Sequence, residues 1–445
     1  MTHKAHDPPQ PHGAAVEIRE GAAPAPAPTA RAVPSERLDN PGAEATRRYL
    51  RQFDLFRVVA FLGVIAQHSV LWPVPGGSIT GWAFVMVLHA TREVFFFLSA
   101  LLAVYTQLAQ PRPLPQLWYR RITQILVPYL AWTAIYFVYT LATSSLSASG
   151  ALSTLGHDLV TGYYQLYFLI VLLQIYVLLP GIVWLVRRTR GHHGWVFGIS
   201  LALQLAMMTV SHYFSWRTGV LGDIRGVDLT LISSRFVVGY QLYVVAGALA
   251  ADHVGELQQL VERNYRRILR VVLAIGLATE GYYFVGIAQG ETPGHASDLY
   301  QPVAAVWFLA ACAGLTALGH AWARRAAKRS PTRFDRLVTW GSDASGGFYL
   351  AHVLVLQLIF SGLTAAGLMA HAVWGAGAIV LYVTTLAGTA ILVAILLRTP
   401  LRFVLTGPNR SDQRARLEWY PPSVGLRREM TRLEMAEAPA QLLAD

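Results

Sequence analysis

The sequence is poor in charged residues. Only 14% of its 445 residues are charged, whereas soluble domains usually carry about 25%. The mean hydropathy is +0.40, and the apolar residues come in blocks of about 20, the length that a helix needs to cross a bilayer. This composition excludes an ordinary soluble enzyme and predicts an all-α, polytopic membrane helix bundle.

Cysteine is nearly absent as well. The single residue, Cys312, excludes an intrachain disulfide and any metal site built from cysteines, and we expect no metal cofactor. No HExxH, P-loop or GxSxG motif occurs, so metalloprotease, ATPase and serine-hydrolase functions have no support. Residues 1–45 hold eight prolines but no apolar core of a signal peptide, which predicts a disordered tail.

Lysine is scarce too, because the chain has two lysines and 34 arginines, with a net charge of +11. The arginines cluster between the apolar blocks, which is typical of membrane topology and argues against a nucleic-acid partner. We count ten spans, at about 53–73, 80–106, 121–142, 163–186, 194–213, 233–251, 268–289, 300–320, 345–367 and 373–397.

The arginines alternate along the connections. Four connections contain no lysine or arginine, namely 74–79, 143–162, 290–299 and 368–372. Of the connections on that side, only 214–232 has any, Arg217 and Arg225. The alternation predicts that both termini are cytoplasmic and that residues 46–400 form one domain in the cytoplasmic membrane, followed by a charged cytoplasmic tail, 401–445.

The first span, Phe53–Trp72, carries Asp54, Arg57 and His68. Arg57 and His68 are eleven residues apart, so in a helix they share one face and lie about 16 Å apart along the axis. An ionisable residue inside a membrane helix is a candidate functional site. The alternative is a snorkelling arginine and a histidine bonded to a neighbouring helix.

The second span carries Arg92, Glu93 and Ser99. Arg92 and Ser99 are seven residues apart and share a face. Adjacent residues point about 100° apart on a helix, so we expect Arg92 and Glu93 each to meet a different neighbouring helix. A functional cavity and an ion pair that only fixes packing are both compatible with this pattern.

Other polar positions have competing interpretations. Arg120 and Arg121 begin the third span, where they could hold phosphates or only anchor the helix. The pair at 192–193, two histidines in a short connection, is expected to be solvated.

The fourth and ninth spans also carry polar groups. Tyr163, Tyr164 and Tyr167 have the composition of an interfacial aromatic belt. Gln165 could hydrogen-bond across the bundle. His352 lies well inside the ninth span, where a histidine is more often structural than catalytic.

Several stretches together resemble the acyltransferase-3 family of integral membrane O-acyltransferases. FDLFRVVAFLGVIAQHSV resembles the first helix of that family, with Arg57 and His68 in the places of its arginine and histidine. TREVFFFLSALL resembles its second helix, although Ala100 replaces the usual glycine. GGFYLAHVLVL resembles a late stretch whose histidine corresponds to His352.

The other two matching stretches depart from the family pattern. WYRRITQILVPYL resembles the basic start of the third helix, but Gln124 replaces an expected basic residue, and Arg121 is the better match for the family's arginine. QLYFLIVLLQIYVLLP resembles the fourth helix, with Gln165 and Tyr167 in place of the usual histidine and tryptophan. The resemblance covers roughly residues 50–400.

The resemblance and the polar positions together predict acyl transfer. The donor would be cytosolic acyl-CoA, most simply acetyl-CoA, and the acceptor a hydroxyl of a carbohydrate or of another cell-envelope or small molecule. His68 would be general base or acyl carrier, and Arg92 would stabilise the carbonyl oxygen. CoA phosphates would bind Arg57, Arg120 and Arg121. Substrate contact or support would come from Asp54, Glu93, Ser99, Gln165 and His352.

A second function from another class fits the same polar residues. A transporter or exporter of a polar or glycolipid solute would also place arginine and glutamate inside the membrane. The spans show no detectable symmetry between halves, which argues against this alternative.

Overall fold

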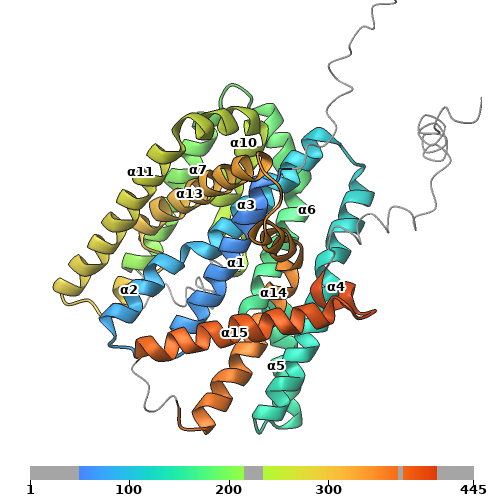
Figure 1. The fold of residues 1–445 in the computed structure, drawn as a ribbon, viewed down its shortest axis with the longest axis vertical. Coiled ribbons are helices and arrows are strands. Elements are labelled where there is room, and N and C mark those ends of the chain that lie inside the picture. The colour runs from blue at the N-terminus through green and yellow to red at the C-terminus, as the bar shows by residue number, and fades with distance from the viewer. Residues whose placement is uncertain (1–49, 215–233, 369–373, 408–445) are drawn as a thin grey trace, which may run out of the picture. The chain divides into compact units, whose positions relative to one another are not determined.

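The computed structural model describes residues 50–214, 234–368 and 374–407, and within these ranges all regular structure is helical (Figure 1). Both expected tails, 1–45 and nearly all of 401–445, and the arginines at 217 and 225 lie outside the described residues. The longer helices are α1 (Gln52–Leu71), α2 (Ile79–Leu88), α3 (Ala90–Ala109), α4 (Leu114–Thr143), α5 (Ala148–Thr161), α6 (Tyr167–Arg188), α7 (His193–Thr209), α10 (Gln241–Asp252), α11 (Val254–Ala288), α13 (Pro302–Ala327), α14 (Arg333–Ala365) and α15 (Trp374–Leu396). Short helical turns are η1 (Tyr164–Leu166), η2 (Val210–Phe214), η3 (Val237–Tyr240), α12 (Pro293–Ala296) and α16 (Arg402–Thr406).

Each of the ten predicted spans has a helical counterpart. Nine helical segments in the described part of the chain are long and apolar enough to cross a membrane. The tenth, residues 237–252, is apolar but shorter, and it consists of η3 and α10. It corresponds to the predicted span 233–251. The all-α membrane bundle predicted from composition is therefore confirmed.

The packing of α1 against α14 agrees with counting the short segment as a crossing. Near the start of both helices, the Ser342 hydroxyl donates to Asp54 at 2.8 Å. Further along both, the rings of His68 and His352 stack. From the first contact to the second, residue numbers increase in both α1 and α14, so the two helices run in the same direction. Among the described helices, seven candidate crossings lie between α1 and α14 when residues 237–252 are counted, which agrees with parallel helices, whereas six would make them antiparallel.

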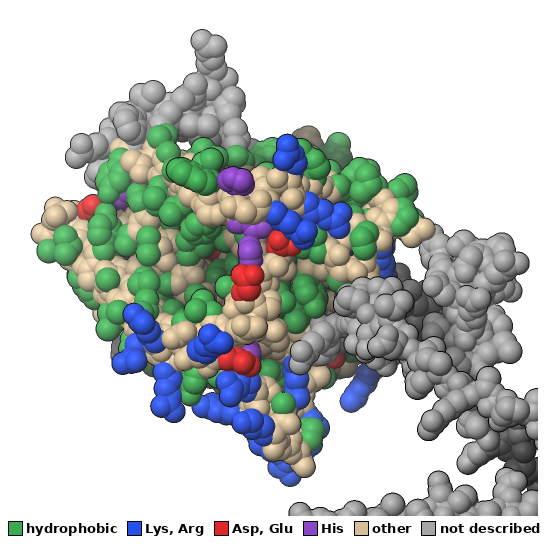
Figure 2. Space-filling view, turned by 90° about the horizontal axis from the view of Figure 1, so that it is seen from above, with side chains coloured by type: hydrophobic (Ala, Val, Ile, Leu, Met, Phe, Trp, Pro, Cys, Tyr) green, Lys and Arg blue, Asp and Glu red, His purple; other side chains and the backbone are tan. Residues whose placement is uncertain are grey.

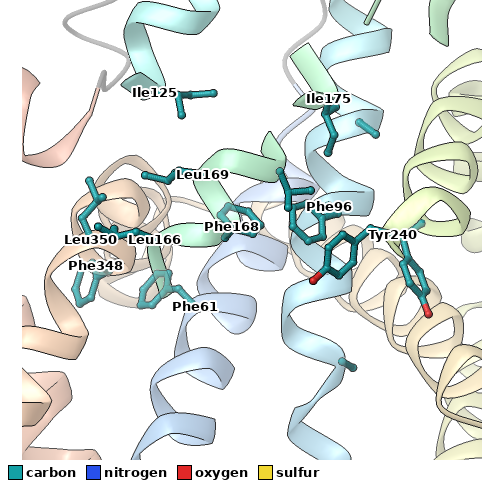
Figure 3. Close-up of a cluster of buried hydrophobic side chains, with 14 of the residues drawn as sticks. Phe61, Phe96, Ile125, Leu166, Phe168, Leu169, Ile175, Tyr240, Phe348 and Leu350 are labelled. Carbon is teal, nitrogen blue, oxygen red and sulfur yellow. The ribbon is translucent and has the colours of Figure 1, made fainter. Parts of the chain in front are cut away.

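Aromatic side chains fill the centre of the bundle. Phe61 of α1 stacks on Phe348 of α14, with ring centroids 4.5 Å apart. Phe96 of α3 stacks on Phe168 of α6 at 4.6 Å and lies 4.4 Å from Tyr240 (Figure 3). Such ring pairs add to the burial of apolar area, and they fix α1, α3, α6 and α14 against one another around the polar residues described below.

The second predicted span, 80–106, corresponds to the candidate span Ile79–Ala109, within which the helix is interrupted. It breaks at His89 into α2 and α3. The indole Nε1 of Trp307 in α13 donates to the Val87 carbonyl at 2.9 Å. A side chain that occupies a backbone carbonyl interrupts the helical ladder. Because the interrupting group comes from a distant helix, the hydropathy pattern alone predicts one continuous span.

The expected connection 143–162 also differs, because it contains the helix α5. This helix ends at Gly162, whose φ of +80° reverses the chain toward η1. A side chain at this position would meet the backbone of Tyr167. Gly162 thus permits a compact break between α5 and α6, at the place where several polar side chains converge.

One end of the bundle is rich in arginine, as the view from above shows (Figure 2). We call it the arginine-rich end: α1, α4 and α11 begin there, and α3, α6 and α13 end there. Arginines near it include Arg51, Arg112, Arg120, Arg121, Arg187, Arg188, Arg190, Arg324 and Arg325. Histidine and acidic side chains lie among the basic ones on this face (Figure 2).

Candidate functional site

Two histidines from opposite ends of the sequence meet inside the bundle. The rings of His68 on α1 and His352 on α14 stack with centroids 5.3 Å apart. The Tyr164 ring lies 5.3 Å from His68 on another side, and its hydroxyl is 3.4 Å from His68 Nδ1. The predicted candidates at 68 and 352 therefore belong to one site.

The orientation of His352 is fixed by the backbone. Its Nδ1 lies 2.8 Å from the Tyr349 carbonyl and 3.1 Å from the Phe348 carbonyl. Carbonyl oxygens only accept, so Nδ1 carries the proton of the neutral ring. The Nε2 atom is left with a lone pair, is buried, and has no hydrogen-bond partner among the residues described here. His352 can therefore accept a proton or hydrogen bond only through Nε2.

The break between the helices α5 and α6 positions Tyr164. Tyr164 has a φ of +34°, which non-glycine residues rarely adopt. The neighbouring Gln165 holds this conformation, because its Nε2 donates to the Tyr136 hydroxyl at 2.6 Å and its carbonyl accepts from the Tyr349 hydroxyl. Strained backbone of this kind clusters at functional sites, and here it places a phenol beside His68.

Arg92 and Glu93 form an ion pair with each other, a contact that the expectation did not include, although Arg92 also meets α6 and Glu93 interacts electrostatically with Tyr243 of α10. Arg92 Nε and Nη2 donate to Glu93 Oε1 at 3.0 and 2.5 Å. Both residues lie in the first turn of α3, and the arginine side chain is long enough to bend round to its neighbour. Arg92 Nη1 also donates to the Tyr167 hydroxyl at 3.1 Å, and its guanidinium lies 4.8 Å from the centre of the Tyr240 ring.

Two links connect the arginine group with the histidine pair. Thr91, next to Arg92, donates to Gln67, next to His68, at 2.9 Å. Tyr167, which accepts from Arg92, lies one turn after Tyr164 at the start of α6. The two candidate residues 68 and 92 thus face one region, where α1, α3 and α6 meet.

A second polar group lies nearer the arginine-rich end. Arg57 Nη1 donates to the Ser342 hydroxyl at 3.4 Å and lies 3.9 Å from Asp54. Asp343 and Tyr176 also interact electrostatically with Arg57. The Arg57 side chain is 29% exposed while that of Asp54 is 2% exposed. The buried carboxylate orients a guanidinium that a ligand can still reach.

Arg120 and Arg121 line a cleft between α3 and α4 at this same end. The cleft is bordered by Ala103, Thr106, Gln107, Arg112, Leu117, Arg120 and Arg121. Arg121 also stacks over the Tyr176 ring, with its guanidinium 5.2 Å from the ring centre. Tyr176 therefore connects the cleft with Arg57, and three of the predicted arginines surround one region of the arginine-rich end.

Beyond α11, the short helix α12 meets the end of the span His193–Tyr213 in a small histidine cluster. His295 of α12 stacks on His212, with ring centroids 4.4 Å apart, and His212 Nδ1 lies 2.9 Å from Asp298. Burial, with a smaller contribution from His212, lowers the pKa of His295. Tyr300, a few residues on, interacts electrostatically with Arg92.

Some residues of the site differ from the sequence expectation. Ser99 lies two turns beyond Arg92, and no hydrogen bond between described residues joins it to the histidines. Tyr164 and Tyr167, interpreted as an aromatic belt, instead contact His68 and Arg92. Gly162, which precedes both tyrosines, is the sequence feature that indicates a break between two helices. Nothing in the local sequence marks the contribution of Ser342, Tyr176 and Tyr240.

Comparison with known proteins supports the same family as the sequence motifs. Residues 50–398 match the acyltransferase-3 family, described as an acyltransferase domain. Searches of curated proteins and of solved structures found no match. The match includes both histidines and all the arginines of the site, and it decides between an enzyme and a transporter. Since it spans well over half of the chain, this protein belongs to the acyltransferase-3 family and is a multi-pass membrane acyltransferase.

Proposed function

We propose that the protein transfers an acyl group, acetyl in the simplest case, from acyl-CoA to a hydroxyl of a carbohydrate or another cell-envelope or small-molecule acceptor. The single observation that carries the proposal is the axial separation of two polar groups on α1. Arg57 and His68 share one face of an unbroken helix, about 16 Å apart by helix geometry. This distance is comparable to the reach of a pantetheine arm.

The donor would enter from the arginine-rich end. Arg57, Arg120 and Arg121 would hold the phosphates of CoA, because guanidinium groups bind phosphate bidentately. The alternating arginines further support a cytoplasmic orientation of this end and of both termini. In the same arrangement, the protein lies in the cytoplasmic membrane and draws acyl-CoA from the cytosol.

The chemistry would take place where α1, α3, α6 and α14 meet. His68 would remove the proton of the acceptor hydroxyl as its oxygen attacks the thioester carbonyl. Arg92 would stabilise the negative charge on the carbonyl oxygen. The carbon–sulfur bond then breaks, and the CoA thiolate takes the proton from His68. In a variant of this route, His68 first carries the acyl group itself.

Neighbouring residues would support these steps. His352 Nε2 is a buried acceptor that could receive a hydrogen bond from the substrate. Glu93 and Tyr167 hold the Arg92 guanidinium in place. Asp54 orients Arg57 through the Ser342 contact. Gln165 would hold the backbone at the break before α6. Ser99 would have a peripheral supporting role.

Labelled acetyl-CoA supplied to membranes that contain the protein tests the donor. We expect label to enter a hydroxyl-bearing acceptor, as an ester that mild base releases. Mass spectrometry of surface glycans and secreted metabolites from a deletion strain would then identify the acceptor class. If label never leaves acetyl-CoA in the presence of these fractions, the proposed donor and acceptor pair is wrong, and other thioesters become the next substrates to test.

A further inference from the structure

Two more histidines meet at the arginine-rich end, away from the proposed reaction. His193 begins α7, just after the turn from α6, and His253 lies between α10 and α11. His193 Nδ1 and His253 Nε2 are 2.8 Å apart. The expectation that the histidines at 192–193 are simply solvated is therefore wrong for His193, whose two ring nitrogens both have partners.

The outer nitrogens of the two rings fix where their protons are. His193 Nε2 lies 2.9 Å from the Val186 carbonyl, and His253 Nδ1 lies 2.9 Å from a carboxylate oxygen of Glu256. Both partners are acceptors only, so each histidine donates its one N–H outward when it is neutral. In this arrangement the two facing nitrogens present lone pairs to each other, and a cation between them would satisfy both.

A carboxylate completes the group. Ligand atoms of His193, Asp252 and His253 all lie within 4.8 Å of one another. We propose that these three residues bind a divalent transition-metal ion of the zinc class, for which imidazole and carboxylate are common ligands. A histidine that binds a metal through one ring nitrogen usually donates a hydrogen bond from the other nitrogen to a carbonyl or carboxylate. The N–H bonds to Val186 and Glu256 fit this arrangement.

Small movements would suffice to admit the ion. Two nitrogens that bind one tetrahedral zinc at about 2.05 Å are about 3.3 Å apart, so the rings need to separate by about 0.5 Å. Both rings are partly exposed, which leaves room for a water as the fourth ligand. The ion would join the α6–α7 turn to the junction of α10 and α11.

Arg190 is a competitor for the same carboxylate. Its Nη2 donates to Asp252 at 2.8 Å, and its side chain is 62% exposed. The guanidinium can swing into solvent when the ion binds, but it opposes the ion as a like charge. Removal of this charge should therefore tighten metal binding, an effect opposite to that of removing a ligand.

The test measures zinc bound per chain, not enzyme activity. The full chain is purified in detergent with a tag that contains no histidine, stripped with EDTA, and titrated with zinc. We expect wild type to retain one zinc ion more than His253→Asn or Asp252→Asn. His157→Asn, on the exposed side of α5, should behave as wild type. Tail histidines 3, 6 and 12 are common to all these proteins, so their contribution cancels.

Two further variants keep all three ligands. Glu256→Gln should weaken zinc binding about tenfold or more, as loss of such an orienting contact does, and Arg190→Gln should strengthen it. Equal zinc content in wild type and His253→Asn would overturn the proposal and leave a proton shared by the two rings as the cation. Should His253→Asn fold poorly, unchanged affinity in both Glu256→Gln and Arg190→Gln overturns it equally.

Discussion

The rings of His68 and His352 stack 5.3 Å apart between two parallel helices, and only one of them is held by the backbone. His352 is fixed by two carbonyl contacts to its Nδ1. The Nδ1 of His68 has a single, longer contact of 3.4 Å with the Tyr164 hydroxyl. The base or carrier role proposed for His68 and the orienting role proposed for His352 both rest on the family resemblance, and two variants, His68→Ala and Tyr164→Phe, test the role of His68.

Replacement of His68 by alanine should abolish most acyl transfer. A general base contributes about 10²–10⁴-fold to the rate, so we expect a fall of that size in kcat with labelled acetyl-CoA. The matched control is His157→Ala, because His157 is exposed on α5 and should leave the rate unchanged. Full activity of His68→Ala at normal expression would remove His68 from the mechanism.

The Tyr164 hydroxyl can be tested separately from its ring. Tyr164→Phe removes the 3.4 Å contact with His68 Nδ1 but keeps the ring packed between His68 and Trp72. A neutral hydrogen bond contributes about 0.5–1.5 kcal/mol, so kcat should fall about two- to tenfold with little change in KM.

Tyr119→Phe, at an exposed position of α4, is the control for the loss of a phenol. A Tyr164→Phe enzyme with wild-type kcat and raised KM would instead indicate that the hydroxyl binds a substrate. Equal kinetics in both variants would show that the strained backbone at Tyr164 serves packing only.

The sequence predicts the spans and one face of α1 well, for a physical reason. A bilayer imposes its length on every crossing helix, and Arg57 and His68 share a face because α1 is unbroken. The sequence does not predict which residues contact that face. Ser342 and His352 are supplied by a helix near the other end of the chain, and no local pattern encodes which distant helix will pack there.

The break at His89 and the contacts of Tyr164 and Tyr167 are harder to predict from the sequence, because their causes are not local. Trp307 donates to the Val87 carbonyl beside the break at His89, although Trp307 and Val87 are 220 residues apart along the chain. Tyr164 and Tyr167 have the same composition as a membrane-interface belt, and only the break after Gly162 turns them inward. The ion pair between the adjacent Arg92 and Glu93 is not visible on a helical wheel, because a wheel gives the direction of each side chain and not the length and flexibility of arginine.

Arg121→Ala should raise the KM for acyl-CoA and leave kcat nearly unchanged. Arg121 lines the α3–α4 cleft, and removal of binding that is equal in ground state and transition state raises KM alone. A charge-assisted contact is worth about 1.5–3 kcal/mol, which corresponds to about a tenfold to hundredfold change. Arg188→Ala, which removes a positive charge from the end of α6, is the control for net charge. An equal KM in both variants would reject a phosphate contact at Arg121.

The Arg92–Glu93 pair can be separated into packing and chemistry. Glu93→Gln should destabilise the protein by about 3–5 kcal/mol, because it leaves a buried guanidinium without its counter-charge. The double variant Arg92→Met/Glu93→Gln removes both charges, so thermal unfolding in detergent should show that much of this stability returns.

Activity then distinguishes the two roles of the pair. If Arg92 stabilises the carbonyl oxygen, the stable double variant should be inactive. A double variant that is both stable and active would mean that the pair only fixes the position of α3. Circular dichroism of each protein before the assay ensures that the rates compare folded enzymes.

Gly247→Ala should loosen the contact between α3 and α10. A Cβ at Gly247 would lie 2.2 Å from the Phe97 carbonyl oxygen and 3.1 Å from the Leu101 nitrogen. Both are backbone atoms, so the helices must separate, at a cost of about 1–3 kcal/mol for an overpacked core. Small residues of this kind let membrane helices approach closely. Because the same interface presents Tyr240 to Arg92, kcat should fall together with the unfolding temperature.

Gly281→Ala, in α11 with nothing near the added carbon, should be neutral or slightly stabilising through its higher helix propensity. Equal unfolding temperatures for the two variants would contradict the close packing of α3 and α10 and, with it, the placement of Tyr240 beneath the Arg92 guanidinium.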